Sequence, residues 1–433
     1  MSEAQPSGYG RPDAARRGQT AGRMPRGATL FGAEALADHV AGRRDDLVEL
    51  LRALIAEPSV LGQEAPVQRV VEERLRAIGF STERVTVDAD AALADPYAGY
   101  PFLSYEGRSS VVGHLPGAGG GRSMHLSGHV DVVPVERPDL WSRDPWGGEL
   151  EGNRVYGRGS ADMKGGVAAY LIAAEAVAEL CPERRGDLLF STVIEEECTG
   201  NGMWSVLRAG HVGDAVLVGE STGLRFAHAA TGVVWCRLVA AGGAGHSMLA
   251  TGEGAFDALG RAVAALRVVE TEINQPVGDP DFAAVRERPY GMTVGKIEGG
   301  VWTASTPYEL TAYVRFGFGP ETLPEEIQAR MRAAVEGTGV EIHFEGFRAR
   351  AHNHPKTGPL VDALNEAHER VLGEPVAPLV NTGTVDTRYV ESVPGLCYGG
   401  IGENLHGTDE WVDVDSLVQT ATVVALTTAG WTA

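Results

Sequence analysis

The sequence has few cysteines, and the four that occur lie far apart, at Cys181, Cys198, Cys236 and Cys397. No two of them form a CxxC pair, and their density is too low for a disulfide-stabilised scaffold. Scattered cysteines of this kind are typical of a reducing compartment. The chain also lacks any uninterrupted run of about 18 apolar residues and any apolar leader segment. We therefore expect a cytoplasmic protein with no signal peptide and no membrane span.

Positive charge is scarce as well. The sequence has 37 Lys and Arg against 58 Asp and Glu, which gives a formal net charge of −21. Because proteins bind nucleic-acid backbones through basic patches, we expect no nucleic-acid partner. An anionic small-molecule substrate would need cations placed locally at its site. The 433 residues, 43% of them hydrophobic, are enough for two or three globular domains.

The order of sequence signals predicts how the chain is organised. Residues 1–30 are rich in Gly, Arg, Pro and Ser, which predicts a disordered tail. Over residues 31–229, helical patterns alternate with short apolar runs such as SMHLSGHVDVV (123–133) and DLLFSTVIE (187–195). This alternation predicts an α/β domain with a central, largely parallel sheet.

A second type of pattern begins near residue 230. Strand and helix signals over residues 230–350 follow the order β-α-β-β-α-β, which is that of a ferredoxin-like α+β domain. Residues 351–433 then return to the earlier alternation. We therefore predict that residues 230–350 are an inserted domain, and that residues 31–229 and 351–433 together form the larger domain.

Polar residues that could bind metal follow the first predicted strands. In LSGHVDVVP, His129 and Asp131 share one face of a strand, and a carboxylate often orients a metal-bound imidazole. A buried His–Asp contact without metal is the alternative. Asp162 lies in the Gly-rich stretch YGRGSADMKGG, where a helix is expected to begin near Met163. An N-cap role for Asp162 is the alternative there, and both roles are compatible.

Further acids and a second histidine occur at later strand ends and in a loop. Three consecutive carboxylates, Glu195, Glu196 and Glu197, end one apolar run, and Glu220 ends the next. His406 lies in the loop IGENLHGTDEW. Each of these alone is typical of solvated surface, but together they make a mixed nitrogen and oxygen ligand set. Such a set suits Zn²⁺, Co²⁺ or Mn²⁺, and it is large enough for two metals that share a carboxylate.

The sequence resembles the M20 metallopeptidase family in five motifs, which occur in the order expected of that family. They are SGHVDVVP, YGRGSADMKGG, EEECTGNG, GES and NLHGTDE. That family includes acetylornithine deacetylases, succinyl-diaminopimelate desuccinylases, aminoacylases and carboxypeptidases. The resemblance runs from about residue 40 to the end of the chain. It implies a zinc-peptidase-like catalytic domain whose inserted domain serves as a lid and for dimerisation.

The resemblance also implies a role for each candidate. The implied metal ligands are His129 and Glu220 in one site, Glu197 and His406 in the other, and Asp162 as the bridge between them. Asp131 would orient His129. When Gly200 and Gly202 are aligned with the family glycines, Glu196 becomes the general base. Because Glu196 and Glu197 would alternate in a strand, this alignment requires the strand to end by Glu195.

The implied reaction is hydrolysis of an amide bond. A water that bridges two divalent metals would be the nucleophile, and Glu196 would move its proton to the leaving nitrogen. We expect an N-acyl amino acid or a related N-acylated amine as substrate, as in acetylornithine deacetylase. A dipeptidase or carboxypeptidase with the same metal site is the alternative, and a ligand-binding member without catalysis is a further one.

Three more residues are candidates for binding substrate or its transition state. His246, in GGAGHSM, matches the family position whose histidine reaches into a partner's active site, which implies a homodimer through the inserted domain. A solvated loop histidine is the alternative. Arg388, in GTVDTRYV, and Arg315 could each hold a substrate carboxylate. A structural ion pair, for instance between Arg388 and Asp386, is the alternative for these arginines.

Overall fold

Helices form where apolar residues recur at helical spacing. The computed structural model describes residues 30–101, 103–243, 245–246, 248 and 254–433, so the predicted tail lies outside the described residues apart from Leu30. Leu47, Leu51 and Leu54 are buried on one face of their helix. The helices are α1 (Leu30–Ala41), α2 (Arg44–Ile55), α3 (Ala65–Ile78), α4 (Ala89–Ala94), α5 (Gly165–Leu180), α6 (Asn201–Arg208), α7 (Ala255–Ile273), α8 (Pro280–Val285), α9 (Pro324–Val335), α10 (Pro359–Leu372) and α11 (Val414–Thr432).

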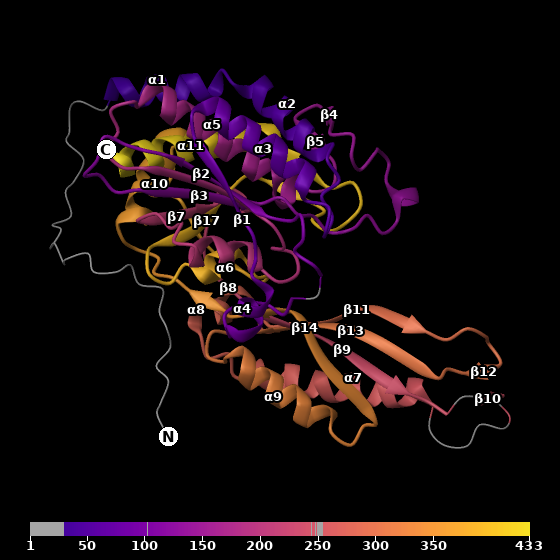
Figure 1. Ribbon diagram of the computed structural model, residues 1–433. Coiled ribbons are helices and arrows are strands. Elements are labelled where there is room, and N and C mark those ends of the chain that lie inside the picture. Colours follow the sequence, from indigo (N-terminus) through magenta and orange to yellow (C-terminus); the bar gives the residue numbers. More distant parts are fainter. Residues whose placement is uncertain (1–29, 102, 244, 247, 249–253) are drawn as a thin grey trace.

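The larger body of the molecule is built on one mixed sheet (Figure 1). Its strands are β1 (Ser81–Val85), β2 (Ser110–Leu115), β3 (Met124–His129), β6 (Leu188–Val193), β7 (Ala215–Val218), β8 (Phe226–Ala230), β15 (His352–Asn353), β16 (Pro378–Asn381) and β17 (Gly395–Tyr398). The order is β1-β2-β6-β3-β7-β17-β8-β15, and β16 pairs with β8. Strands β6, β3, β7 and β17 are mutually parallel, and β16 is parallel to β8. Strands β1, β2 and β15 pair antiparallel with their neighbours, and β8 is antiparallel to β17 and β15. The predicted α/β class is confirmed, but the sheet is mixed rather than largely parallel.

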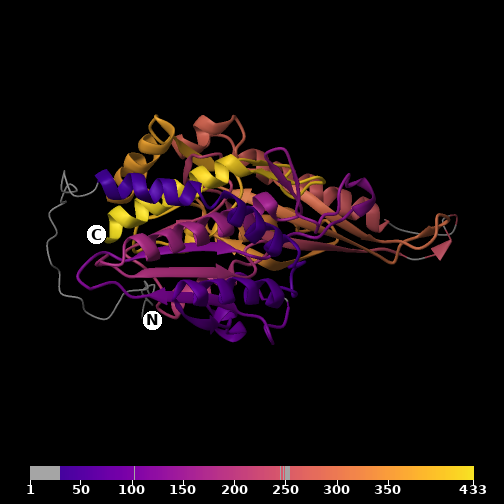
Figure 2. The same ribbon diagram turned by 90° about the horizontal axis from the view of Figure 1, so that it is seen from above.

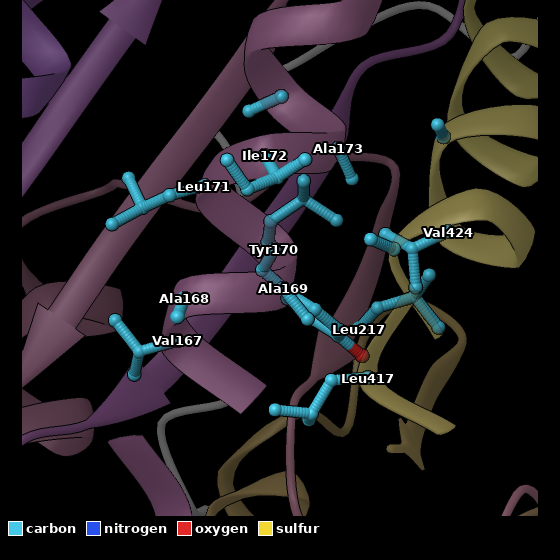
Figure 3. Close-up of a cluster of buried hydrophobic side chains, with 14 of the residues drawn as sticks. Val167, Ala168, Ala169, Tyr170, Leu171, Ile172, Ala173, Leu217, Leu417 and Val424 are labelled. Carbon is cyan, nitrogen blue, oxygen red and sulfur yellow. The ribbon is translucent and has the colours of Figure 1, made fainter. Parts of the chain in front are cut away.

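Helix α5 lies at the centre of the main core. Its apolar residues extend around the whole helix, and such helices are buried on all sides. Figure 3 shows Val167, Tyr170 and Ile172 of α5 gathered with Leu217 of β7 and Leu417 of α11. The Tyr170 hydroxyl donates to the carbonyl of Tyr398, so α5 is also tied to the parallel centre of the sheet.

A smaller sheet projects away from this body (Figures 1 and 2). It contains β9 (Gly232–Ala241), β11 (Met292–Gly299), β13 (Glu309–Phe318) and β14 (Val340–Ala349), in the order β11-β13-β9-β14 with antiparallel pairing throughout. Side chains alternate between buried and partly exposed along β9, and α7 and α9 pack beside the sheet. Two connections, one after β8 and one after β14, join the smaller sheet to the body.

The remaining strands form short ribbons. Strands β18 (Gly402–Glu403), β19 (Trp411–Asp413), β5 (Arg154–Tyr156) and β4 (Glu149–Glu151) make a four-stranded sheet in that order. Strands β10 (Gly245–His246) and β12 (Ser305–Thr306) form a pair at the far end of the smaller sheet (Figure 1). No helix within the described residues is both long enough and apolar enough to cross a membrane.

Candidate metal and catalytic site

Three neighbouring parallel strands end at one edge of the large sheet. His129 is the last residue of β3, while β6 ends at Val193 and β7 at Val218. Because β3 pairs in parallel with both β6 and β7, the segments that follow these strands meet at the same edge. Ligands of open α/β sheets bind at this carboxyl edge. The edge therefore gathers His129, the acidic triplet and Glu220.

His129 lies between two carboxylates. Its Nε2 is 3.1 Å from Oδ1 of Asp162 and 3.8 Å from Oε1 of Glu220. Burial alone would lower the pKa of His129, but the hydrogen bond with Asp162 and the charges of Glu220 and Asp131 raise it well above its ordinary value. Burial and the nearby Asp162 charge raise the pKa of Glu220 to about 8, despite the opposing effect of His129.

Asp162 also contacts the second histidine. The Nε2 atom of His406 is 3.2 Å from Oδ2 of Asp162 and 3.2 Å from Oε2 of Glu197. Hydrogen bonds with Asp162 and Glu197 raise the pKa of His406 to about 11. Burial alone would raise the pKa of Asp162, but its hydrogen bonds with both histidines lower it well below the ordinary value. The two oxygens of Asp162 thus face different histidines, which is the arrangement expected of a bridging carboxylate.

The three glutamates of the acidic triplet point in different directions because the strand ends before them, and Glu195 points away from the other two. Glu195 has a φ of 64°, and its carbonyl accepts the N–H groups of Thr199 and Gly200. Its carboxylate accepts from the Tyr105 hydroxyl at 2.8 Å and from Arg108 at 2.6 Å, away from the metal ligands. The requirement that the strand end by Glu195 is met, since β6 ends at Val193.

Two glycines of the same motif have steric roles. Gly200 has a φ of 74°, and a Cβ atom there would lie 1.7 Å from Nη2 of Arg388. A Cβ atom on Gly202 would lie 2.1 Å from the carbonyl oxygen of Ile194. The turn after the triplet therefore needs glycine at both positions in order to pack against the backbone of Ile194 and the side chain of Arg388.

Asp131 contacts the triplet rather than the histidine through its carboxylate. Nδ1 of His129 is 2.9 Å from the main-chain oxygen of Asp131 and 3.8 Å from its carboxylate. The carboxylate instead accepts the N–H groups of Glu196 at 3.1 Å and Glu197 at 3.0 Å. Burial raises the pKa of Asp131 to about 7. The expected orientation of His129 by the Asp131 carboxylate is thus replaced by a contact with the Asp131 carbonyl.

Glu196 lies beside Arg388. Nη1 of Arg388 is 3.3 Å from Oε1 of Glu196, and Nη2 is 3.6 Å from Asp386, so the ion pair with Asp386 is also present. Nε and Nη2 of Arg388 are buried without a hydrogen-bond acceptor among the described residues. Burial and the charge of Asp386 raise the pKa of Glu196 well above its ordinary value. Glu196 is thus a buried carboxyl group paired with a buried arginine.

The segment around Asp162 differs from the expected helix start. Asp162 and Met163 have non-helical backbone angles within the turn Ser160–Lys164, and α5 begins only at Gly165. Asp162 is therefore not the N-cap of α5. Two unpredicted charged residues, Arg158 and Glu410, lie beneath this turn and hydrogen-bond to its backbone or to each other. Glu410 stands in the same motif as His406, but nothing in the sequence distinguishes it from a solvated acid.

The other two candidates for binding substrate or its transition state lie in strands outside the large sheet. Arg315 is on β13 of the smaller sheet, and its guanidinium is 3.4 Å from the carbonyls of Gly291 and Thr382. Burial and the neighbouring Arg286 lower the pKa of Arg315. His246 is in β10, far from β3 and β7 in the same chain (Figure 1), and its side chain lies outside the described residues.

The donor set fits divalent cations. Ligand atoms of His129, Glu196 and Glu220 lie within 4.8 Å of one another, and so do those of His129, Asp162 and Glu197. Several buried carboxylates lie together here, and buried anions are costly unless a cation compensates them. Imidazole and carboxylate ligands together suit Zn²⁺, Co²⁺ or Mn²⁺. The residues present could therefore hold metal.

Comparisons with known proteins agree with this architecture. A model of Peptidase family M20/M25/M40 matches residues 125–429. The chain is 28% identical over 394 residues to a succinyl-diaminopimelate desuccinylase of Beijerinckia indica, covering 87% of this chain and 96% of that relative.

Solved structures show the same fold. The di-peptidase Dug1p from Saccharomyces cerevisiae matches with a TM-score of 0.75 at 14% identity, over 92% of this chain and 98% of that one. The Bacillus subtilis YXEP protein, described as a dinuclear metal-binding peptidase from the M20 family, matches with a TM-score of 0.57 at 16% identity, over 90% and 98%.

Proposed function

This chain belongs to Peptidase family M20/M25/M40 and is a hydrolytic enzyme, and we propose that it hydrolyses the amide bond of an N-acyl amino acid or a related N-acylated amine. The observation that carries the proposal is the convergence of His129, Asp162 and Glu220 with Glu197 and His406, beside the buried pair of Glu196 and Arg388. The desuccinylase relative removes an acyl group, which favours deacylation.

The cluster would hold two divalent cations, with Zn²⁺ favoured and Co²⁺ or Mn²⁺ as alternatives. His129 and Glu220 would bind one cation, Glu197 and His406 the other, and Asp162 both. Support comes from the contacts of Asp162 with both histidines and from the dinuclear relative of the same fold. When bound, such cations supply Lewis-acid chemistry that polarises an amide carbonyl and makes water more acidic.

The side chains of the chain would then manage protons and orientation. Glu196 would accept the proton of the attacking water and deliver it to the leaving nitrogen, from a buried position 3.3 Å from Nη1 of Arg388. Asp131, through the N–H groups of Glu196 and Glu197, would keep both carboxylates in place. The guanidinium of Arg388, whose Nε and Nη2 lack a hydrogen-bond acceptor among the described residues, would bind a substrate carboxylate, with Arg315 as a second candidate.

We further propose a cytoplasmic homodimer formed through the smaller domain, in which His246 stabilises the oxyanion in the site of a second copy. Its position in β10, remote from the cluster of its own chain, supports action on another copy. Val301, Trp302 and Tyr308, which are 97%, 72% and 80% exposed, lie near β12 and offer apolar surface for such contact. The four cysteines are free, as expected in a reducing compartment.

A substrate comparison tests the proposal. Purified protein loaded with Zn²⁺ or Co²⁺ is assayed with N-acetyl and N-succinyl amino acids and with dipeptides that release the same amine. Higher kcat/KM for the N-acyl compounds is the expected result. A clear preference for dipeptides would instead establish the dipeptidase alternative, which fits the same cluster and the fold of the di-peptidase. Sedimentation measurements of the native protein and of a Trp302→Asp variant test the dimer.

A further inference from the structure

The turn that carries Asp162 rests on one buried carboxylate. Oε1 of Glu410 accepts the N–H groups of Ala161 at 2.9 Å and Asp162 at 3.0 Å. Oε2 accepts the N–H of Gly159 at 3.0 Å and Nη1 of Arg158 at 2.5 Å. Glu410 has 0% exposure, and these four donors occupy both of its oxygens. The Glu410 carboxylate therefore fixes the backbone of the Asp162 turn through main-chain N–H groups and not through the Asp162 carboxylate.

The same ion pair reaches the loop that carries His406. Nη2 of Arg158 donates to the carbonyl of His406 at 3.2 Å and to that of Gly407 at 3.0 Å. Arg158 is 2% exposed, and the ring of Trp141 lies 5.4 Å from the guanidinium carbon. One guanidinium thus connects two segments that are separated by about 248 residues in the sequence.

The His406 loop needs such support because its backbone is unfavourable. Asn404, His406 and Asp409 have φ values of 59°, 62° and 52°, in the left-handed region that side chains other than glycine rarely adopt. Such conformations persist only where the surrounding structure holds them. Arg158 binds the carbonyl of the central strained residue and so favours the backbone conformation that aims the His406 ring at Asp162.

From this arrangement we propose that Arg158 and Glu410 are positioning residues that set the distance between Asp162 and His406, and thereby the affinity of one of the two cations. The proposal rests on the metal site of the proposed function. It affects most the cation bound by His406, because that cation would use both Asp162 and His406, whereas the other cation shares only Asp162 with the supported segments. The remaining ligands of that other cation are held elsewhere, since His129 ends β3 and Glu220 follows β7.

The test uses Arg158→Lys, which keeps the charge but loses the forked geometry, and Glu410→Gln, which keeps the shape but loses an acceptor. Metal-free protein is titrated with Zn²⁺ in equilibrium dialysis, and both binding constants are measured. We expect the second cation to bind about 10- to 100-fold more weakly in both variants, while the first, which shares Asp162, weakens much less. With Co²⁺, the visible absorption that accompanies the second equivalent should require correspondingly more metal.

The matched control is Glu72→Gln. Glu72 is a buried carboxylate that also binds arginine, at 2.7 Å from Arg76 and 2.6 Å from Arg84, and it lies in α3 away from the ligand loops. Loss of a buried charge pair there should lower the Tm and leave both metal affinities unchanged. Circular dichroism on every variant reports whether it is folded before metal is added.

The outcomes separate this inference from the proposed function. Wild-type binding of both cations by Arg158→Lys and Glu410→Gln would overturn the positioning role and leave the hydrolase proposal standing. Equal weakening of both cations would also overturn it, and so would failure of both variants to fold in saturating Zn²⁺, since either result means a general structural role. A wild-type protein that binds fewer than two cations would instead contradict the proposed metal site itself.

Discussion

The main-chain N–H of Glu196 donates to the carboxylate of Asp131 across 3.1 Å, which ties the acidic turn to the end of β3. The neighbouring N–H of Glu197 donates to the other carboxylate oxygen at 3.0 Å. Asp131 therefore fixes the two residues proposed as general base and metal ligand. Asp131 supports the site through its contacts with the acidic turn as much as through its contact with His129.

Replacement of Asp131 by Asn should loosen this turn. An amide group can accept only one of the two N–H groups and presents its own donors to the other. We expect kcat to fall about 10- to 100-fold, with weaker metal binding at the ligand Glu197. Steady-state kinetics together with metal analysis checks this, and an Asp131→Asn enzyme with wild-type kcat and metal content would contradict it.

Replacement of Glu196 by Gln should separate chemistry from metal binding. We expect kcat to fall by about 10²- to 10⁴-fold because no group remains to transfer the proton. Metal content should stay at the wild-type level. Glu195→Gln is the matched control, since that carboxylate binds Tyr105 and Arg108 and faces away from the ligands. It should reduce stability by ~1–3 kcal/mol and kcat far less.

Replacement of Arg388 by Lys should affect substrate binding. An ammonium group cannot form the paired hydrogen bonds of a guanidinium with a carboxylate. We expect KM to rise about 10-fold or more while metal content is unchanged. Arg315→Lys provides the comparison, because Arg315 lies near two main-chain carbonyls in the smaller sheet. A larger KM effect for Arg315→Lys would assign the substrate carboxylate to Arg315 instead.

His125 should make folding stability depend on pH. Burial lowers its pKa to about 3, and Nε2 lies 2.8 Å from the Ser191 hydroxyl. Between pH 3 and about 6.5 the unfolded chain binds a proton here that the folded chain does not, so this contribution to stability is lost as pH falls. At pH 5 the stability lost in this way is about 2 kcal/mol.

Urea unfolding of wild type and His125→Gln, at pH 7 and pH 5, measures this contribution. Gln can keep a hydrogen bond to Ser191 but does not titrate. The wild type should therefore lose more stability between the two pH values than the variant. Equal losses in the two proteins would rule out His125 as the source of the pH dependence.

Much of the site could be predicted from sequence because its ligands follow apolar strands. The runs that became β3, β6 and β7 are recognisable, and parallel pairing brings their ends together. The alignment of Gly200 and Gly202 with the family glycines required the strand to end by Glu195, and β6 ends at Val193. The α/β class and the family resemblance are both confirmed.

The contacts that hold these ligands could not be predicted. Glu410 looks like a solvated acid in sequence, and its four donors come from residues about 250 positions earlier. Whether Nδ1 of His129 contacts the carbonyl or the carboxylate of Asp131 depends on the direction of the backbone at the end of β3. The late start of α5 likewise reflects the packing of the Asp162 turn on Glu410, which local propensity does not encode.

The position of β17 has a consequence for synthesis of the chain. Residues 395–398 supply the strand between β7 and β8, so the large sheet is interrupted until nearly the whole chain has left the ribosome. The smaller sheet, complete at Ala349, can form earlier. Chains truncated between Ala349 and Gly395 should therefore expose the apolar edges of β7 and β8 and aggregate, even though they contain every strand of the smaller sheet.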